Sequence, residues 1–182
     1  LGKIYYYGQG VEQDDSKARK YYKRASDQGN PEALYAMGEM YAVGRGVDES
    51  EEIANTYFRA AALQYEWKAT QGDAAAQYKL GQMYRSGEGV EQDDSKAIYY
   101  HELAADQGDS KAQFMLGGLY ETQGVHQNHG KAIHHYKLGA NQGMVSCQFR
   151  LGWMYAEGRI VNQNHKKAMK YYKLAAEQGE FR

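Results

Sequence analysis

Proline and cysteine are almost missing from this chain of 182 residues, which contains one of each, Pro31 and Cys147. A lone cysteine excludes an intramolecular disulfide framework, and a lone proline leaves nearly the whole chain free to be helical. No run of about 18 apolar residues occurs, so we predict no membrane span. With 22 Lys+Arg and 23 Asp+Glu, the formal net charge is -1. The sequence therefore lacks the concentrated basic field that nucleic acids or anionic membranes require.

Glycine, by contrast, is abundant, with 21 residues, and regularly placed. A Leu-Gly or Met-Gly pair recurs, and a tyrosine follows three residues after each glycine. These glycines are Gly2, Gly38, Gly81, Gly117 and Gly152, separated by 36, 43, 36 and 35 residues. The nine-residue segment at 10–18 is repeated identically at 89–97. The chain is therefore built from internal repeats. We expect a single domain, 1–182, with repeats at 1–29, 30–72, 73–108, 109–143 and 144–182.

Each repeat is expected to form two helices, called helix A and helix B below. In the third repeat they are predicted at about 74–86 and 94–106. A capping residue precedes every predicted helix B, since its side-chain oxygen can accept an unpaired backbone N–H; these residues are Asp14, Ser50, Asp93, Asn128 and Asn164. Glycine is expected to end helix B, at Gly29, Gly72, Gly108, Gly143 and Gly179.

Small residues on helix A predict how the two helices pack. Ala76, Leu80, Gly81 and Tyr84 fall on one face of the third helix A. Helix B offers Ala97, Tyr100 and Ala104, which have counterparts in the first and fifth repeats. Because one such helix pair cannot bury its apolar face alone, neighbouring repeats must stack to make a continuous core.

The repeated pattern resembles the Sel-one-like repeat (SLR) family. The pattern is A-x-x-x-L-G-x-x-Y-x-x-G-x-G-V, followed by D-x-x-K-A-x-x-Y-x-x-x-A-A-x-x-G, and residues 76–108 carry it almost without fault. The resemblance implies an all-α, right-handed α/α superhelical solenoid, similar to tetratricopeptide repeats. It also implies an adaptor role and a soluble bacterial protein, whether cytoplasmic, periplasmic or secreted; the sequence does not decide the compartment.

Three departures from the pattern are informative. The second repeat has about seven extra residues around 62–68, which is roughly two helical turns, so helix B is expected to lengthen without rotating its packing face. The fourth loop is one residue shorter at 123–125, and Ile160 replaces the second loop glycine of the fifth repeat. No polar capping helix is recognisable at either end. We therefore expect a piece of a longer array, or end-to-end self-association.

An aromatic residue three positions before the helix A glycine is the main candidate for partner binding. These residues are Tyr35, Tyr78, Phe114 and Phe149, and Arg85 and Trp153 are expected near them. By analogy with tetratricopeptide solenoids, helix A would line the concave surface. Aromatic rings with interspersed polar groups suit the capture of a peptide or a helix. The alternative is that these rings only pack between adjacent A helices.

A second candidate lies in the extra residues of the second repeat, which bring Tyr65 and Trp67. A protruding helix end with these rings could dock a partner or a neighbouring copy. In the alternative interpretation, Trp67 folds back over the adjacent helix pair.

No pattern in the chain predicts a catalytic, metal or cofactor site. The histidines of the fourth repeat lack zinc-ligand spacing, and the G-x-G-V loops lack the Gly-Lys-Ser/Thr of a phosphate loop. Cys147 takes the small-residue position of Ala33 and Ala76, so we expect it to be buried packing. We predict no metal, no cofactor and no nucleic-acid partner.

Three functions remain open on the sequence alone. The first is a non-catalytic scaffold that binds a protein or peptide. The second is a binder of small ligands or cell-wall fragments with weak hydrolase activity, although relatives linked to penicillin binding carry paired cysteines in each repeat, and this chain does not. The third is a spacer within a larger multidomain protein.

Overall fold

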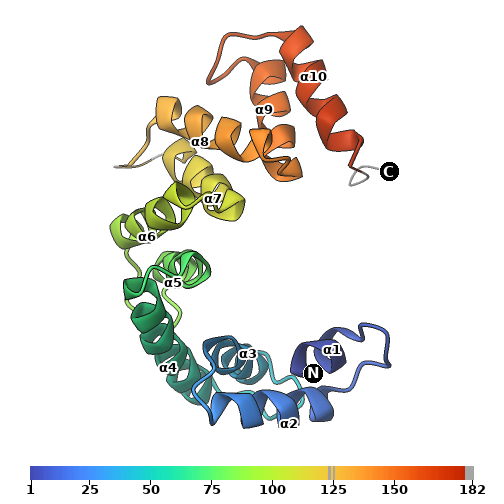
Figure 1. Ribbon diagram of the computed structural model, residues 1–182, viewed down its shortest axis with the longest axis vertical. Coiled ribbons are helices and arrows are strands. Elements are labelled where there is room, and N and C mark those ends of the chain that lie inside the picture. Colours follow the sequence, from blue (N-terminus) through green and yellow to red (C-terminus); the bar gives the residue numbers. More distant parts are fainter. Residues whose placement is uncertain (123, 125, 179–182) are drawn as a thin grey trace. The chain divides into compact units, whose positions relative to one another are not determined.

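The computed structural model describes residues 1–122, 124 and 126–178, and within them it is all-α with ten helices and no strand (Figure 1). The helices are α1 Gly2–Tyr7, α2 Asp15–Ser26, α3 Pro31–Ala42, α4 Glu51–Thr70, α5 Ala74–Ser86, α6 Asp94–Asp106, α7 Ser110–Glu121, α8 His129–Asn141, α9 Val145–Glu157 and α10 His165–Ala176. Odd-numbered helices are the A helices and even-numbered ones the B helices. Gln123, Val125 and Gly179, on which sequence predictions fell, lie outside the described residues.

The chain divides into two compact units, Leu1–Ala97 and Ile98–Arg182, with the boundary inside α6. In the first unit α3 packs against both α2 and α4, and α4 also packs against α5 (Figure 1). In the second unit α8 packs against both α7 and α9, and α9 packs against α10. Within each unit these helices therefore pack on their neighbours in the chain, as in an α/α solenoid.

The predicted helix boundaries and caps are confirmed. The third repeat has its helices at Ala74–Ser86 and Asp94–Asp106, as expected. The side chains of all five predicted helix B caps accept a backbone N–H three residues later, for example from Lys17 to Asp14 at 2.9 Å. Among the described residues, the glycines predicted to end helix B have positive φ, 74° at Gly29 and 86° at Gly72.

The helix A glycine lies directly against an aromatic ring of helix B. A Cβ added at Gly38 would lie 2.6 Å from the ring of Phe58, and one added at Gly117 would lie 2.4 Å from the ring of Tyr136. Gly2 and Gly152 meet Tyr22 and Tyr172 in the same way. Only glycine allows this approach, because any larger residue would push the ring out of the core.

The tyrosine three residues after each of these glycines makes a second contact with helix B, by ring stacking. In four repeats the ring centroids lie 5.7 to 5.9 Å apart, with the planes within 12° of parallel. The stacked pairs are Tyr5–Tyr21, Tyr41–Tyr57, Tyr120–His135 and Tyr155–Tyr171. A lysine from the first turn of helix B covers the ring of Tyr5, Tyr84, Tyr120 and Tyr155, with its Nζ 4.7 to 5.3 Å from the centroid.

The extra residues of the second repeat lengthen helix B, as predicted. Helix α4 has 20 residues, whereas α6 and α8 each have 13. Its buried residues stay on one face, because Tyr65 and Ala69 follow Ala61 and Ala62 at helical spacing. Seven residues make close to two full turns, so the end of α4 presents the same face to the third repeat.

Successive repeats are joined by contacts to the main chain of the preceding helix B. A Cβ at Gly89, the second glycine of its loop, would lie 2.3 Å from the backbone carbon of Phe58. The corresponding Gly46 lies against Asp15, including its backbone oxygen at 3.1 Å. In addition, a buried glutamine of helix A donates its side-chain amide to an alanine carbonyl near the end of the preceding helix B. These bonds run from Gln77 to Ala69, Gln113 to Ala105 and Gln148 to Ala140, at 3.0 to 3.2 Å.

Candidate functional site

Three of the aromatic residues that lie three positions before the helix A glycine, Tyr35, Phe114 and Phe149, rest on a ring of their own helix B. Tyr35 lies 5.2 Å from Phe58, centroid to centroid, and Phe149 lies 5.5 Å from Tyr172, with the planes tilted by 54° in both pairs. Phe114 lies 6.0 Å from Tyr136. The helix B ring that packs on the helix A glycine therefore also packs on the candidate binding residue three positions before that glycine.

These candidate rings are neither buried nor fully exposed. Tyr35, Tyr78 and Phe114 are half-buried, and Phe149 is 41% exposed. Tyr35, Phe114 and Phe149 are supported by the ring of their own helix B, and Tyr35 also contacts Lys79 of the next A helix and Glu88 of the loop after it. The helix B ring therefore supports Tyr35, Phe114 and Phe149, and part of each of these side chains remains exposed.

Tyr35 lies at the centre of a polar cluster in the first unit. Its hydroxyl donates to Glu88 Oε2 at 2.6 Å, and Ser86 donates to the same oxygen at 3.0 Å. The Nζ of Lys79 lies 5.6 Å from the ring centroid of Tyr35. Burial, followed by the bond to Glu88, raises the pKa of Tyr35 well above its usual value, so this hydroxyl remains a donor at physiological pH.

Glu39 lies one helical turn after Tyr35, and within the described part of the chain it makes no hydrogen bond or ion pair. Burial of the carboxyl group raises its pKa, while the positive charge of Lys79 lowers it and the negative charge of Glu88 raises it.

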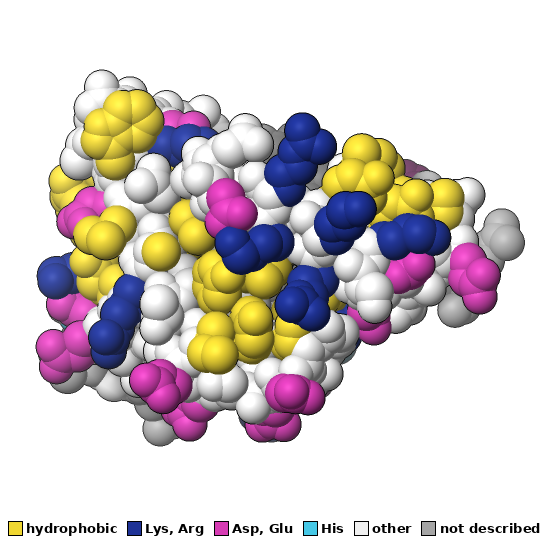
Figure 2. Space-filling view, turned by 90° about the horizontal axis from the view of Figure 1, so that it is seen from below, with side chains coloured by type: hydrophobic (Ala, Val, Ile, Leu, Met, Phe, Trp, Pro, Cys, Tyr) yellow, Lys and Arg dark blue, Asp and Glu magenta, His cyan; other side chains and the backbone are white. Residues whose placement is uncertain are grey.

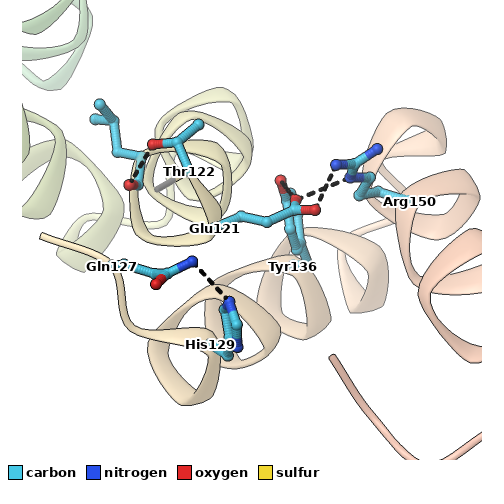
Figure 3. A network of polar contacts seen from close by, with 7 residues as sticks. Glu121, Thr122, Gln127, His129, Tyr136 and Arg150 are labelled. Atoms are coloured by element: carbon cyan, nitrogen blue, oxygen red, sulfur yellow. Dashed lines mark hydrogen bonds and ion pairs between the residues drawn. The ribbon is translucent and has the colours of Figure 1, made fainter. Parts of the chain in front are cut away.

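The second unit presents an ionic network beside its candidate rings (Figure 3). Glu121 accepts from the hydroxyl of Tyr136 at 2.8 Å and from Nε of Arg150 at 2.9 Å, and a second bond joins the other carboxylate oxygen to the same guanidinium. The guanidinium also lies over the ring of Trp153, 4.4 Å from its centroid. Trp153 is half-buried under this cation, whereas Arg85 in the first unit is exposed.

The sequence interpretation of Tyr65 needs correction. Its side chain is 2% exposed and belongs to the buried face of α4, so it cannot offer its ring to a partner. The reason is the two-turn extension itself, which continues the packing face of the helix through Tyr65. Trp67 is two residues further on, faces the other way and is 63% exposed, so it does not fold back over the neighbouring helices.

The groups considered for chemistry take structural positions. Cys147 is buried against Gly139, and burial raises the pKa of its thiol to about 12, as expected of a packing residue. His135 stacks on Tyr120 and hydrogen-bonds the Gln113 side chain at 2.8 Å, and Gln127 lies 3.1 Å from His129 (Figure 3). No group of three or more His, Cys, Asp or Glu able to hold a metal was found among the described residues.

Sequence reasoning missed the contacts that join the repeats. Gln77, Gln113 and Gln148 recur four residues before the helix A glycine, and this period could have identified them. The second loop glycine was not expected to contact another repeat, whereas Gly46 and Gly89 pack on the preceding repeat.

On the face shown in Figure 2, hydrophobic side chains lie between Lys/Arg and Asp/Glu, and neither charge forms a continuous field. Within the described residues, no helix is both long enough and apolar enough to cross a membrane.

Comparison with solved structures gives two informative matches. A Sel1 repeat protein from Oxalobacter formigenes is 28% identical, with a TM-score of 0.71 over 98% of this chain and 68% of that chain. A protective antigen present in uropathogenic Escherichia coli strains, displaying an SLR fold, is 30% identical, with a TM-score of 0.61 over 99% of this chain and 45% of that chain. This chain therefore spans less than half of the antigen.

A third solved structure shares the fold alone. An immunity protein from Pseudomonas aeruginosa is 18% identical, with a TM-score of 0.52 over 97% of this chain and 81% of that chain. No curated protein gives a significant match.

The family model of the Sel1 repeat matches five times, at residues 1–30, 31–65, 74–109, 110–144 and 145–180. Residues 66–73, which it leaves unmatched in the middle, include the last turns of the long α4. Such repeats generally form protein-interaction scaffolds and are typically non-catalytic. This chain belongs to the Sel1 repeat family.

Proposed function

We propose that this protein is a non-catalytic scaffold that holds a protein or peptide segment on the exposed face of its A helices. The observation that carries the proposal is a set of A-helix rings that helix B supports and that remain partly exposed. Tyr35, Phe114 and Phe149 each rest on a helix B ring. A ring that is already held in place loses little conformational freedom when a partner covers it, so its burial contributes more to affinity.

The polar groups around the rings favour a polypeptide over a small apolar ligand. Glu39 and Lys79 flank Tyr35, and the Arg150 guanidinium lies over Trp153. Such alternation of rings with donors and acceptors suits the side chains and main chain of an extended segment or a helix.

The remaining alternatives have less support. A small-ligand site with hydrolase activity would need an activated nucleophile, yet the thiol of Cys147 is buried and its pKa is raised by that burial. A spacer role would not require open rings along the A helices.

The test is a comparison of captured proteins between two variants of the second unit. Phe114→Leu/Phe149→Leu removes two rings but keeps apolar volume over Tyr136 and Tyr172. The matched control, Tyr99→Ala/Met169→Ala, removes two side chains that are 55% and 69% exposed on B helices. Each bait is incubated with lysate of the source organism, and retained proteins are identified by mass spectrometry.

We expect a protein that the unaltered chain and the control retain to be lost from the Phe114→Leu/Phe149→Leu bait. Circular dichroism and thermal melting first establish that all baits are folded. If the folded variant retains the same proteins as the control, the A-helix face is not the binding surface. If neither bait retains any protein that the empty matrix does not, the scaffold proposal fails.

A further inference from the structure

The two extra turns of α4 carry an apolar ridge that the other repeats lack. Leu63 and Trp67 are 65% and 63% exposed, and they lie one turn apart on the outer side of the helix. The buried face of the same turns is occupied by Ala62, Tyr65 and Ala69. The ridge is therefore held by a well-packed helix and is not a frayed end.

Two opposite charges accompany this ridge. Arg59 lies one turn before Leu63, and Glu66 is next to Trp67; both are exposed. Within the described residues neither forms a salt bridge. Seven residues separate Arg59 from Glu66, about 10.5 Å along the helix, so they cannot pair with each other.

We propose that this ridge is the contact surface for a second copy of the chain, with the two α4 helices packed antiparallel about a twofold axis at Leu63. In this arrangement Leu63 meets its own counterpart. The axial distance from Leu63 to Arg59 equals that to Trp67, so each guanidinium lies level with the indole of the other copy. Glu66 of that copy lies about 1.5 Å closer than Trp67 to the twofold axis, measured along the helix, and is within reach of the same guanidinium.

Charge complementarity is the argument for a second copy as the occupant. Along α4 the ridge presents a cation, an aliphatic side chain, an anion and an indole, in that order. When a second helix runs in the opposite direction about Leu63, the cation of each copy faces both the indole and the anion of the other. A twofold contact uses the same patch on both partners, so a self-complementary patch is what it requires. The net charge of -1 adds little repulsion between copies.

Sedimentation equilibrium over about 5 to 500 μM tests the proposal, because a contact between two short ridges is small and should be weak, on the order of 10 to 100 μM. We expect the unaltered chain to dimerise and Trp67→Ala to weaken the dimer at least about tenfold, since that variant loses the ring from both sides. Met169→Ala, which removes a side chain 69% exposed on α10, serves as the control and should leave the dimer unchanged.

Charge reversal distinguishes the proposed geometry from other dimers. Arg59→Glu and Glu66→Arg should each weaken the dimer, and the double variant should recover much of the loss because the pair is re-formed across the twofold axis. Melting curves confirm that these surface variants fold.

A chain that stays monomeric at all concentrations overturns the proposal, whichever other partner the ridge then has. A dimer that is insensitive to Trp67→Ala, or that the double charge reversal does not restore, also overturns it and directs attention to other surfaces. The Phe114→Leu/Phe149→Leu variant should dimerise normally, so this experiment can fail without affecting the proposed A-helix function.

Discussion

Two adjacent glycines in α7 have very different surroundings. A Cβ at Gly117 would lie 2.4 Å from the ring of Tyr136, whereas one at Gly118 would meet only its hydroxyl oxygen, at 3.8 Å. We predict that Gly117→Ala destabilises the protein by about 1–3 kcal/mol, because the ring must leave its packed position. Urea unfolding followed by circular dichroism measures the effect.

Gly118→Ala is the matched control, with the same substitution at the next residue. It should be neutral or stabilising by up to about 1 kcal/mol, since alanine is the better helix former and the space is open. Similar destabilisation by both variants would mean that loss of glycine in α7, and not contact with the ring, is responsible.

His135 is the residue for which we expect a pH effect on stability. Its pKa is lowered from 6.5, chiefly by burial. The charge of His134 also lowers it, Glu102 raises it, Lys131 lowers it and Asp106 raises it. The folded state binds this proton less readily than the unfolded state. The contribution of neutral His135 to the free energy of unfolding is therefore fully present above pH 6.5. It should be lost as the pH falls from 6.5 through the lower pKa of the folded state.

The variant His135→Tyr restores the tyrosine found at this position in the other repeats and should reduce the loss of stability between pH 7.5 and 5. The exposed neighbour provides the control, and His134→Gln should leave most of the loss in place. The measurement is the urea midpoint of each protein at both pH values. An unchanged pH dependence in His135→Tyr would contradict the assignment.

At this scale the sequence predicted residue types better than contacts. The caps and the terminal glycines followed from local chemistry. The sequence pattern drew attention to Tyr100 of helix B, whose counterparts in the first and fifth repeats are Tyr21 and Tyr171. The rings that cover the glycines in those two repeats belong to the next residues, Tyr22 and Tyr172. Two consecutive aromatics differ by only about 100° on a helix, and the crossing of the two helices, which the sequence does not specify, decides which one meets the glycine.

The length of α4 can be tested as a property of the whole element. Deletion of residues 62–68 joins Ala61 to Ala69 and should give a helix like α6, with Ala69 still placed to accept from Gln77. We expect a folded protein with a cooperative thermal transition and a lower Tm, because the buried Tyr65 is lost. Circular dichroism measures both the helix content and the transition.

A five-residue deletion, 64–68, is the control for register. It rotates the end of α4 by about 140° relative to its start, so it should break the contact with the third repeat and reduce both cooperativity and helix content. If the two deletions behave alike, the phase of the helix does not matter to the fold.

The extension also shows what the sequence could not decide within an element. Its length and effect on the packing face followed from counting residues. The burial of Tyr65 did not, because a helix phase assigned without a known neighbour leaves open which ring of the Tyr65–Trp67 pair points inward.

For the whole chain, the separate compact units suggest that stability is local. Repeat proteins gain stability mainly within repeats and between nearest neighbours. Gly38→Ala, which would bring a Cβ to 2.6 Å from Phe58, should therefore increase amide hydrogen exchange in α3 and α4 while leaving α8 to α10 unchanged. Mass spectrometry of peptic fragments resolves these segments. A uniform loss of protection along the chain would mean that it unfolds as one unit.

Family membership could be predicted at this scale because the five-fold recurrence of glycine, tyrosine and alanine is visible without a structure. The contacts between repeats could not, since a glycine that packs on a neighbour and a glycine that only turns the chain look identical in sequence. Gly89 is an example, because a Cβ there would lie 2.3 Å from the backbone of Phe58 in the preceding repeat, a contact that its loop motif does not reveal.

Gly89 and Gln77 join their repeat to the preceding one through contacts with its main chain, at Phe58 and Ala69. Backbone atoms are the same in every repeat, so these contacts depend little on which side chains the preceding repeat carries. A gene that duplicated, lost or exchanged one repeat would still encode compatible junctions. The identical segments at 10–18 and 89–97 are what such copying would leave. The number of repeats could then change over evolution by single recombination events, without a new interface having to arise each time.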